Sequence, residues 1–394
     1  MLNKIEDFQN ILNKKLNKFF DTKYIYLKKN DINIEELIND YQRLKKININ
    51  KRYKKISLKL TKFDKKKYLK HDYSYRKKIV KIYDFLKKRQ VQKYFKVFLI
   101  HGSLATKDYI KGWSDVDTFV VIKDNILLSK KKLLELKKII KELYKIFLSI
   151  TKLQHHGLIM FTEFDLKNYQ SSYLPFQAFK KNLNLLNNNK ITFNLEVKPN
   201  KNIYFDLIER HKLLVQANSK GEYKHHPRNN KFLSVPLKAG KKEMYQLFCH
   251  LGYVNTLPAY YFSAIGKNCS KKDSFKLFYK TQVGKKLKSF LKKSEEVRKT
   301  WNQNQKKIFT IPIWVIEKIG KDYINQSQKN FKILINEIEK KINIKDYSLA
   351  KKHIAKIAKD YNFFSLYEYG SYNNPGLSDI DLFLIINKKK KPKD

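Results

Sequence analysis

The 394-residue chain is 42% apolar and contains 26 tyrosines and 26 phenylalanines, enough to fill packed cores, which excludes a wholly disordered protein. No apolar run approaches the roughly 18 residues of a membrane-spanning helix, so we expect no membrane partner. Lysine and arginine number 85 against 36 acidic residues, and the resulting formal net charge of +49 is typical of proteins that bind nucleic acid.

The charge distribution and the cysteine content bear on partners and location. Only seven of the 85 basic residues are arginine, and the lysines are spread along the whole chain. That distribution also fits a genome rich in A and T, so nucleic acid remains one of two interpretations of the charge. The two cysteines, Cys249 and Cys269, give no disulfide framework and suit a reducing compartment, so we expect a cytoplasmic protein.

The first 85 residues are dense in lysine and show a mostly helical pattern of apolar residues. Two interpretations fit them: a solvated helical extension, or a basic arm that docks a substrate. We favour the solvated extension, since a run of like charge usually marks an exposed face.

A Gly-Ser turn and an Asp-x-Asp pair lie in the next stretch, residues 97–122, each beside an apolar strand pattern. Along a strand, Asp115 and Asp117 point to the same side, where two carboxylates repel each other unless a cation lies between them. Mg²⁺ takes one or two carboxylates together with substrate phosphates. Glycine lets the backbone approach a ligand, and the first amides of a following helix point at an anion. The pattern predicts a metal site at Asp115 and Asp117 beside a triphosphate site at Gly102 and Ser103.

The segments that follow complete a first domain over residues 86–200. Apolar residues at three- and four-residue spacing predict a helix over 125–150. Residues 153–166 are interpreted as a strand with acids near its far end, and residues 191–199 as a further strand.

Residues 201–305 are interpreted as a helical accessory domain, with a transitional segment over 201–235. The stretch Ser270–Phe275 allows two compatible interpretations. Ser270 and Asp273 fit a capping box at a helix start. Alternatively, Lys271 or Lys272 lies over a triphosphate and neutralises charge on the leaving group.

The C-terminal part repeats the first motif. Residues 306–345 are expected to be a helical linker. In residues 346–394 an apolar strand pattern leads to Gly370 and Ser371. After seven intervening residues come Asp379 and Asp381, which precede another strand pattern. The chain therefore contains a tandem repeat whose second copy has no later strands and no helical domain of its own.

Both motifs resemble the signature of the nucleotidyltransferase superfamily typified by DNA polymerase β, and the resemblance extends more loosely over residues 85–300. It implies an α/β (α+β) fold: a mixed sheet flanked by helices, a helical domain, and here a truncated second copy of the sheet unit. It also implies a reaction in which an acceptor attacks the α-phosphate of a nucleoside triphosphate, with ATP expected and Mg²⁺ or Mn²⁺ as cofactor. Pyrophosphate is released. The acceptor is open among RNA, protein and small molecules.

The family also has a third carboxylate on a later strand, and this sequence leaves its identity open. Glu163 is our candidate catalytic acid, with Asp165 and Glu196 as alternatives. Where the family places the acid, this chain has His155 and His156, so a histidine replacing the acid is the other interpretation. The histidine pair is better explained as a polar strand start than as a zinc site.

Three functional classes follow from these motifs. The first is a nucleotidyltransferase, and the second is a catalytically weak or inactive module of the same fold that binds nucleotide or RNA. The third, a purely structural basic protein, leaves both aspartate pairs without a use. Intact pairs in both copies favour the enzyme. We expect the second motif, at Gly370, Ser371, Asp379 and Asp381, to have no independent activity, because two aspartates on one strand leave a metal under-coordinated.

Overall fold

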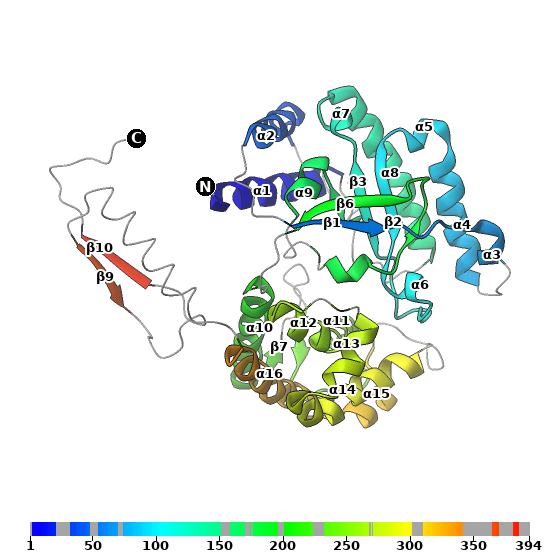
Figure 1. The fold of residues 1–394 in the computed structure, drawn as a ribbon. Helices are drawn as coiled ribbons and strands as arrows, with labels where there is room; N and C mark the ends of the chain where they lie inside the picture. Colours follow the sequence, from blue (N-terminus) through cyan, green and yellow to red (C-terminus); the bar gives the residue numbers. More distant parts are fainter. Residues whose placement is uncertain are drawn as a thin grey trace. The chain divides into compact units, whose positions relative to one another are not determined.

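The computed structural model divides into two compact units (Figure 1). The first contains Met1–Lys198, Asn268–Asp273 and Lys293–Thr310, and the second contains Pro199–Lys267, Ser274–Lys292 and Ile311–Asp394. The residues that the structure describes are 2–20, 32–47, 54–69, 74–150, 158–169, 174, 176–195, 201–223, 232–267, 269, 271–301, 310–341, 365–369 and 381–385.

The elements up to residue 195 belong to the first unit. They are, in chain order, α1 (Leu2–Phe20), α2 (Ile34–Lys46), β1 (Lys54–Lys59), α3 (Lys65–Leu69), α4 (Ser74–Lys87), α5 (Arg89–Gln92), β2 (Phe95–Ile100), α6 (Gly102–Thr106), β3 (Thr118–Ile122), α7 (Asp124–Leu127), α8 (Lys130–Ile150), β4 (Met160–Phe161), α9 (Glu163–Lys167), the 3₁₀-helix η1 (Phe176–Phe179), β5 (Leu183–Asn184) and β6 (Lys190–Leu195).

A four-stranded mixed sheet with the order β4-β3-β2-β5 forms the centre of this unit. β2 pairs antiparallel with β3 and β5, and β3 pairs parallel with β4. β1 and β6 form a separate antiparallel pair, drawn in blue and green in Figure 1. The mixed sheet flanked by helices is the α/β fold expected from the sequence.

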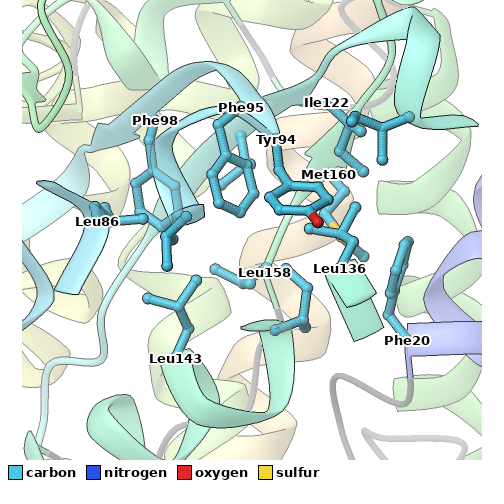
Figure 2. Close-up of a cluster of buried hydrophobic side chains, with 14 of the residues drawn as sticks. Phe20, Leu86, Tyr94, Phe95, Phe98, Ile122, Leu136, Leu143, Leu158 and Met160 are labelled. Atoms are coloured by element: carbon cyan, nitrogen blue, oxygen red, sulfur yellow. The ribbon is translucent and has the colours of Figure 1, made fainter. Parts of the chain in front are cut away.

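One face of the sheet packs on helices. Phe20 of α1, Leu86 of α4 and Leu143 of α8 belong to one buried cluster with Phe95 and Phe98 of β2 (Figure 2). The rings of the two β2 phenylalanines meet edge to face, with centroids 5.5 Å apart. This cluster holds the sheet and the helices together, because burial of apolar area is the main stabilising term.

The opposite face of β2 and β3 packs on the β1–β6 pair. Leu99 and Phe119 share a second buried cluster with Leu58 of β1 and Phe193 of β6. Both faces of β2 and β3 are therefore covered, which explains why these two strands appear in the sequence as nearly continuous apolar runs.

The N-terminal region does not form the separate solvated extension that the lysine content suggested. Leu12, Leu16, Phe19 and Phe20 of α1 are buried in the same core as the sheet. They recur at helical spacing and form one apolar stripe, while lysines such as Lys18 lie on the exposed side. The many lysines therefore indicated the exposed face of α1 and not the buried one.

The second unit is mainly helical. Its described elements are α10 (Lys201–Lys220), β7 (Glu222–Tyr223), β8 (Leu233–Ser234), α11 (Met244–Val254), α12 (Leu257–Ala264), most of α13 (Lys271–Phe278), the first part of α14 (Gln282–Thr300), α15 (Ile313–Ile319), α16 (Tyr323–Glu339), β9 (Ser365–Tyr369) and β10 (Asp381–Ile385).

Two segments of this unit differ from the expectation. The transitional segment over 201–235 begins with a 20-residue helix, α10, which packs against α12 and α16. The supposed linker over 306–345 contains α15 and α16, and Ile319 and Phe331 in these helices are buried. Because these side chains are buried, α15 and α16 are part of the core of the second unit and not an exposed linker. In the described part of either unit, no helix has the length and apolar character needed to cross a membrane.

Candidate active site

The two halves of the first motif meet at one end of the β2–β3 pair. Ile100 lies opposite Thr118, and the amide of the next residue, His101, donates to the carbonyl oxygen of Asp117 at 3.0 Å. The two aspartates directly precede β3 and lie outside the strand itself. Val116 is buried while Asp115 and Asp117 are half-buried, so the alternation expected of extended backbone is present.

Glycine is required at position 102 for two reasons. Its φ is +63°, in the left-handed region that side chains disfavour. In addition, a Cβ atom built on Gly102 would lie 2.0 Å from Oδ2 of Asp117, well inside van der Waals contact. The Asp117 carboxylate therefore lies directly over the Gly102 backbone, and the Gly-Ser turn and the aspartate pair form one constellation.

The surroundings of Asp117 disfavour its negative charge. Burial, and then repulsion from Asp115, raise the pKa of Asp117 well above its ordinary value, while the charge of Lys271 acts in the opposite direction. Hard oxygen donors that repel each other fit a divalent cation. Among the described residues no group of three histidine, cysteine or acidic side chains is arranged to hold a metal. Two carboxylates still suit Mg²⁺, because it completes its shell with water and substrate phosphates.

Lys271 joins this site from the start of α13, within the first unit. The residue as a whole is exposed, yet loss of water around its ammonium group, together with repulsion from Arg298, lowers its pKa. Attraction to Asp117 and Asp115 opposes that shift. Lys272 is also exposed, and no interaction described here brings it to the aspartates. The capping box proposed at Ser270 lies outside the described residues.

Three residues that the sequence analysis did not single out also belong to this region. Asp108 accepts hydrogen bonds from Arg298, and Trp301 donates one to the backbone of the same loop at Gly112. Residue rarity pointed to two of them, Arg298 and Trp301, since the chain has seven arginines and three tryptophans; no signal in the sequence pointed to Asp108.

Glu163 and Asp165 do not join the aspartate pair. The expected long strand is two residues in β4, and both acids lie on the short helix α9. Thr162 and Asp165 form a capping box that starts this helix, which the strand interpretation overlooked. Glu163 pairs with Lys96 and accepts from the amide of Asp124 at 3.3 Å. Since Lys96 is the second residue of β2 and Asp124 follows β3, Glu163 lies at the opposite end of these strands from Gly102.

The other candidates for the third acid, His155, His156 and Glu196, fall outside the described residues. The same holds for Gly370, Ser371 and Asp379 of the second copy. In that copy the described parts are β9 and β10, an antiparallel pair in which Asp381 lies opposite Tyr369.

The two motif segments have the same strand register. In the first, the second aspartate of the motif, Asp117, pairs with the residue before the Gly-Ser turn. In the second, Asp381 lies opposite Tyr369, which also directly precedes the Gly-Ser dipeptide. The spacing from Ser103 to Asp115 is longer than that from Ser371 to Asp379, so the loop length varies while the register stays the same.

Comparison with known proteins finds a similarity for the segment that holds the first motif. Residues 77–168 match the family model described as a nucleotidyltransferase domain. The chain contains a nucleotidyltransferase domain. The matched segment holds Gly102, Ser103, Asp115 and Asp117, whereas Lys271 lies beyond it. No curated protein and no solved structure matches the chain. Nucleotidyltransferase domains transfer nucleotidyl groups and generally use a nucleoside triphosphate and a divalent metal.

Proposed function

We propose that this chain transfers a nucleoside monophosphate from a nucleoside triphosphate, with ATP as the expected donor, to an acceptor hydroxyl. A bond forms between the acceptor oxygen and the α-phosphorus, and the bond from that phosphorus to the oxygen bridging to the β-phosphate breaks. Pyrophosphate leaves, and the hydroxyl proton passes to a base. The observation that carries the proposal is the Asp117 carboxylate held against the Gly102 backbone beside Asp115.

Asp115 and Asp117 would hold the divalent cation, Mg²⁺ or Mn²⁺. Their mutual repulsion and the oxygen-only donor set favour such an ion. When bound, the cation supplies charge stabilisation to the α-phosphate during the displacement.

Other residues of the site would bind the triphosphate. The amides that follow Gly102 and the hydroxyl of Ser103 are proposed to hold the terminal phosphates, because glycine permits close approach of backbone to ligand. Lys271, placed by its attraction to the aspartates, is proposed to neutralise charge on the departing pyrophosphate. Lys272, exposed one residue further along α13, remains a weaker candidate for the same role.

The acceptor is proposed to be RNA, a protein or a small molecule. The net charge of +49 supports a polyanion among these, and such binding would weaken steeply with salt. We propose that the second motif adds no catalysis of its own.

The proposal is tested by mass spectrometry of a reaction that contains the protein, isotope-labelled nucleoside triphosphates, Mg²⁺ and cell extract. We expect a labelled nucleotide to appear on one acceptor class and pyrophosphate to accumulate. Metal-dependent nucleotide binding without pyrophosphate release would instead support the binding module of the same fold.

A further inference from the structure

The loop that joins the two halves of the first motif, residues 107–114 (the motif loop), is held at two points by hydrogen bonds from the end of α14 and from the residue that follows it. Nη2 of Arg298 donates to Oδ2 of Asp108 at 3.0 Å and to the Asp108 carbonyl oxygen at 3.1 Å. Nε1 of Trp301 donates to the carbonyl oxygen of Gly112 at 3.0 Å. Arg298 lies in the last turn of α14, and Trp301 directly follows the helix, which ends at Thr300. All four residues belong to the first unit.

Each fastened point is linked to one half of the motif. On one side, the amide of Asp108 donates to the carbonyl oxygen of Ser103 at 3.0 Å, which closes the end of α6. On the other, the Ser114 hydroxyl accepts from the amide of Ile110 at 3.0 Å, and Ser114 directly precedes Asp115. A shift of the motif loop would therefore move the phosphate turn and the aspartates relative to each other.

The first point is an ion pair between Arg298 and Asp108. Burial opposes it, but hydrogen bonding from Thr106 and the charge of Arg298 hold the pKa of Asp108 below its ordinary value. The side chain of Arg298 is only 17% exposed. A guanidinium is planar and fixes the direction of its hydrogen bonds, which an ammonium does not. Only seven of the 85 basic residues are arginine, and one of them occurs at this position, where the direction of the hydrogen bonds matters.

The second point is an aromatic contact. The rings of Trp113 and Trp301 meet edge to face, with centroids 5.3 Å apart at an interplanar angle of 74°. Trp113 itself is buried. Packing and the indole hydrogen bond together hold the far end of the motif loop.

We propose that Arg298 and Trp301 are positioning residues for nucleotidyl transfer, which set the distance between the phosphate turn at Gly102 and the aspartate pair through the motif loop. This inference rests on the proposed function. If the inference is right, removing the contacts of Arg298 or Trp301 with the motif loop lowers the turnover number more than it lowers the affinity for nucleotide. The reason is that a displacement of about 1 Å at reacting groups costs on the order of a hundredfold in rate.

The test compares Arg298→Ala, Arg298→Lys and Trp301→Phe in the full chain, with pyrophosphate release and thermal unfolding as readouts. We expect Arg298→Ala to lower kcat about tenfold or more, with KM for nucleotide changed about twofold or less. Arg298→Lys should recover part of kcat, because the charge remains while the planar geometry is lost. Trp301→Phe keeps the ring and removes the donor, so its loss should be smaller. Lys65→Ala, which breaks the exposed Lys65–Asp84 pair between α3 and α4, is the matched control and should leave kcat unchanged.

Distinct outcomes separate this inference from the proposed function. Absence of pyrophosphate release by the unsubstituted protein would overturn both. An active unsubstituted protein with kcat unchanged in Arg298→Ala and Trp301→Phe would overturn the inference alone. If Arg298→Ala does not fold, the test rests on Arg298→Lys and Trp301→Phe. A loss of kcat in either variant at an unchanged Tm supports the positioning role. A kcat loss in either variant that is accompanied by a matching loss of Tm would overturn it.

Discussion

Asp115 and Asp117 lie at one end of the β2–β3 pair, and Glu163 and Asp165 lie beyond the other end. At the second end every acid has a partner that suits it. Asp165 is buried and accepts from the Thr162 amide at 2.6 Å and from the Thr162 hydroxyl at 2.7 Å, while Glu163 faces Lys96. At the first end the pKa of Asp117 is raised by burial and by the charge of Asp115, while Lys271 acts in the opposite direction.

This contrast separates two uses of the same residue type. Acids whose oxygens are matched by donors stabilise the local structure, and here they begin α9. Acids placed side by side destabilise the fold when no metal is bound, and binding of a cation between them stabilises it. The four predictions below test that division, from the largest expected effect to the smallest.

Replacing both aspartates at the first end should abolish turnover. We expect Asp115→Asn with Asp117→Asn to lower pyrophosphate release about a thousandfold, because several kcal/mol of charge stabilisation depend on the cation. Without metal, the variant should melt no lower than the unsubstituted protein, since the substitution removes repulsion. The matched control is Asp379→Asn with Asp381→Asn in the second copy, which should leave turnover unchanged. A large loss in that control would show that the second copy contributes to catalysis.

Gly102→Ala should disrupt the same site, because the added side chain collides with Asp117. The new Cβ collides with Asp117 and the left-handed backbone adds strain, so we expect a loss of stability of about 1–3 kcal/mol and loss of most activity. Gly240→Ala is the matched control, because φ there is +75° but nothing lies within 4 Å of an added Cβ. Urea unfolding and pyrophosphate release measure both. Equal effects at the two glycines would contradict the close approach of Asp117.

Asp165→Ala, at the other end of the strands, should lower stability and leave turnover unchanged. It leaves buried donors of Thr162 without their acceptor, so we expect a stability loss of about 1–3 kcal/mol with kcat unchanged. Glu163→Gln, at a half-exposed ion pair, should change stability by less than about 1 kcal/mol. Denaturant unfolding and steady-state kinetics on folded protein separate the two quantities. Loss of turnover in Glu163→Gln would restore it as the third acid.

A buried histidine in the second unit extends the comparison to pH. His250 lies between the Tyr223 hydroxyl and the Ser327 hydroxyl, and burial lowers its pKa to about 3. A lowered pKa stabilises the fold above the ordinary histidine value of about 6.5, and that contribution is lost as pH falls from there toward 3. Between pH 7.5 and 5.5 we expect a loss of about 1 kcal/mol, absent in His250→Phe. Urea titrations at the two pH values measure the difference; equal losses in both proteins would refute it.

The sequence was most informative where the relevant residues are close in the chain. Spacing around Gly102 and Asp117 predicted the turn and the two strands beside it. It was less informative over residues 153–166, because a short apolar stretch fits a strand or a helix, and the Thr162–Asp165 capping pair was overlooked. Arg298 and Asp108 are 190 residues apart, and no local pattern encodes such a contact.

The meeting of Trp113 and Trp301 gives the molecule an optical signal of its own. Two indole chromophores 5.3 Å apart and inclined at 74° couple their electronic transitions and produce a paired positive and negative band in circular dichroism. The third tryptophan, Trp314, belongs to the second unit. The coupled bands therefore report the joining of the motif loop to the end of α14 without a dye or a label. They would follow it in the same sample while substrates are added, independently of whether any bond is made.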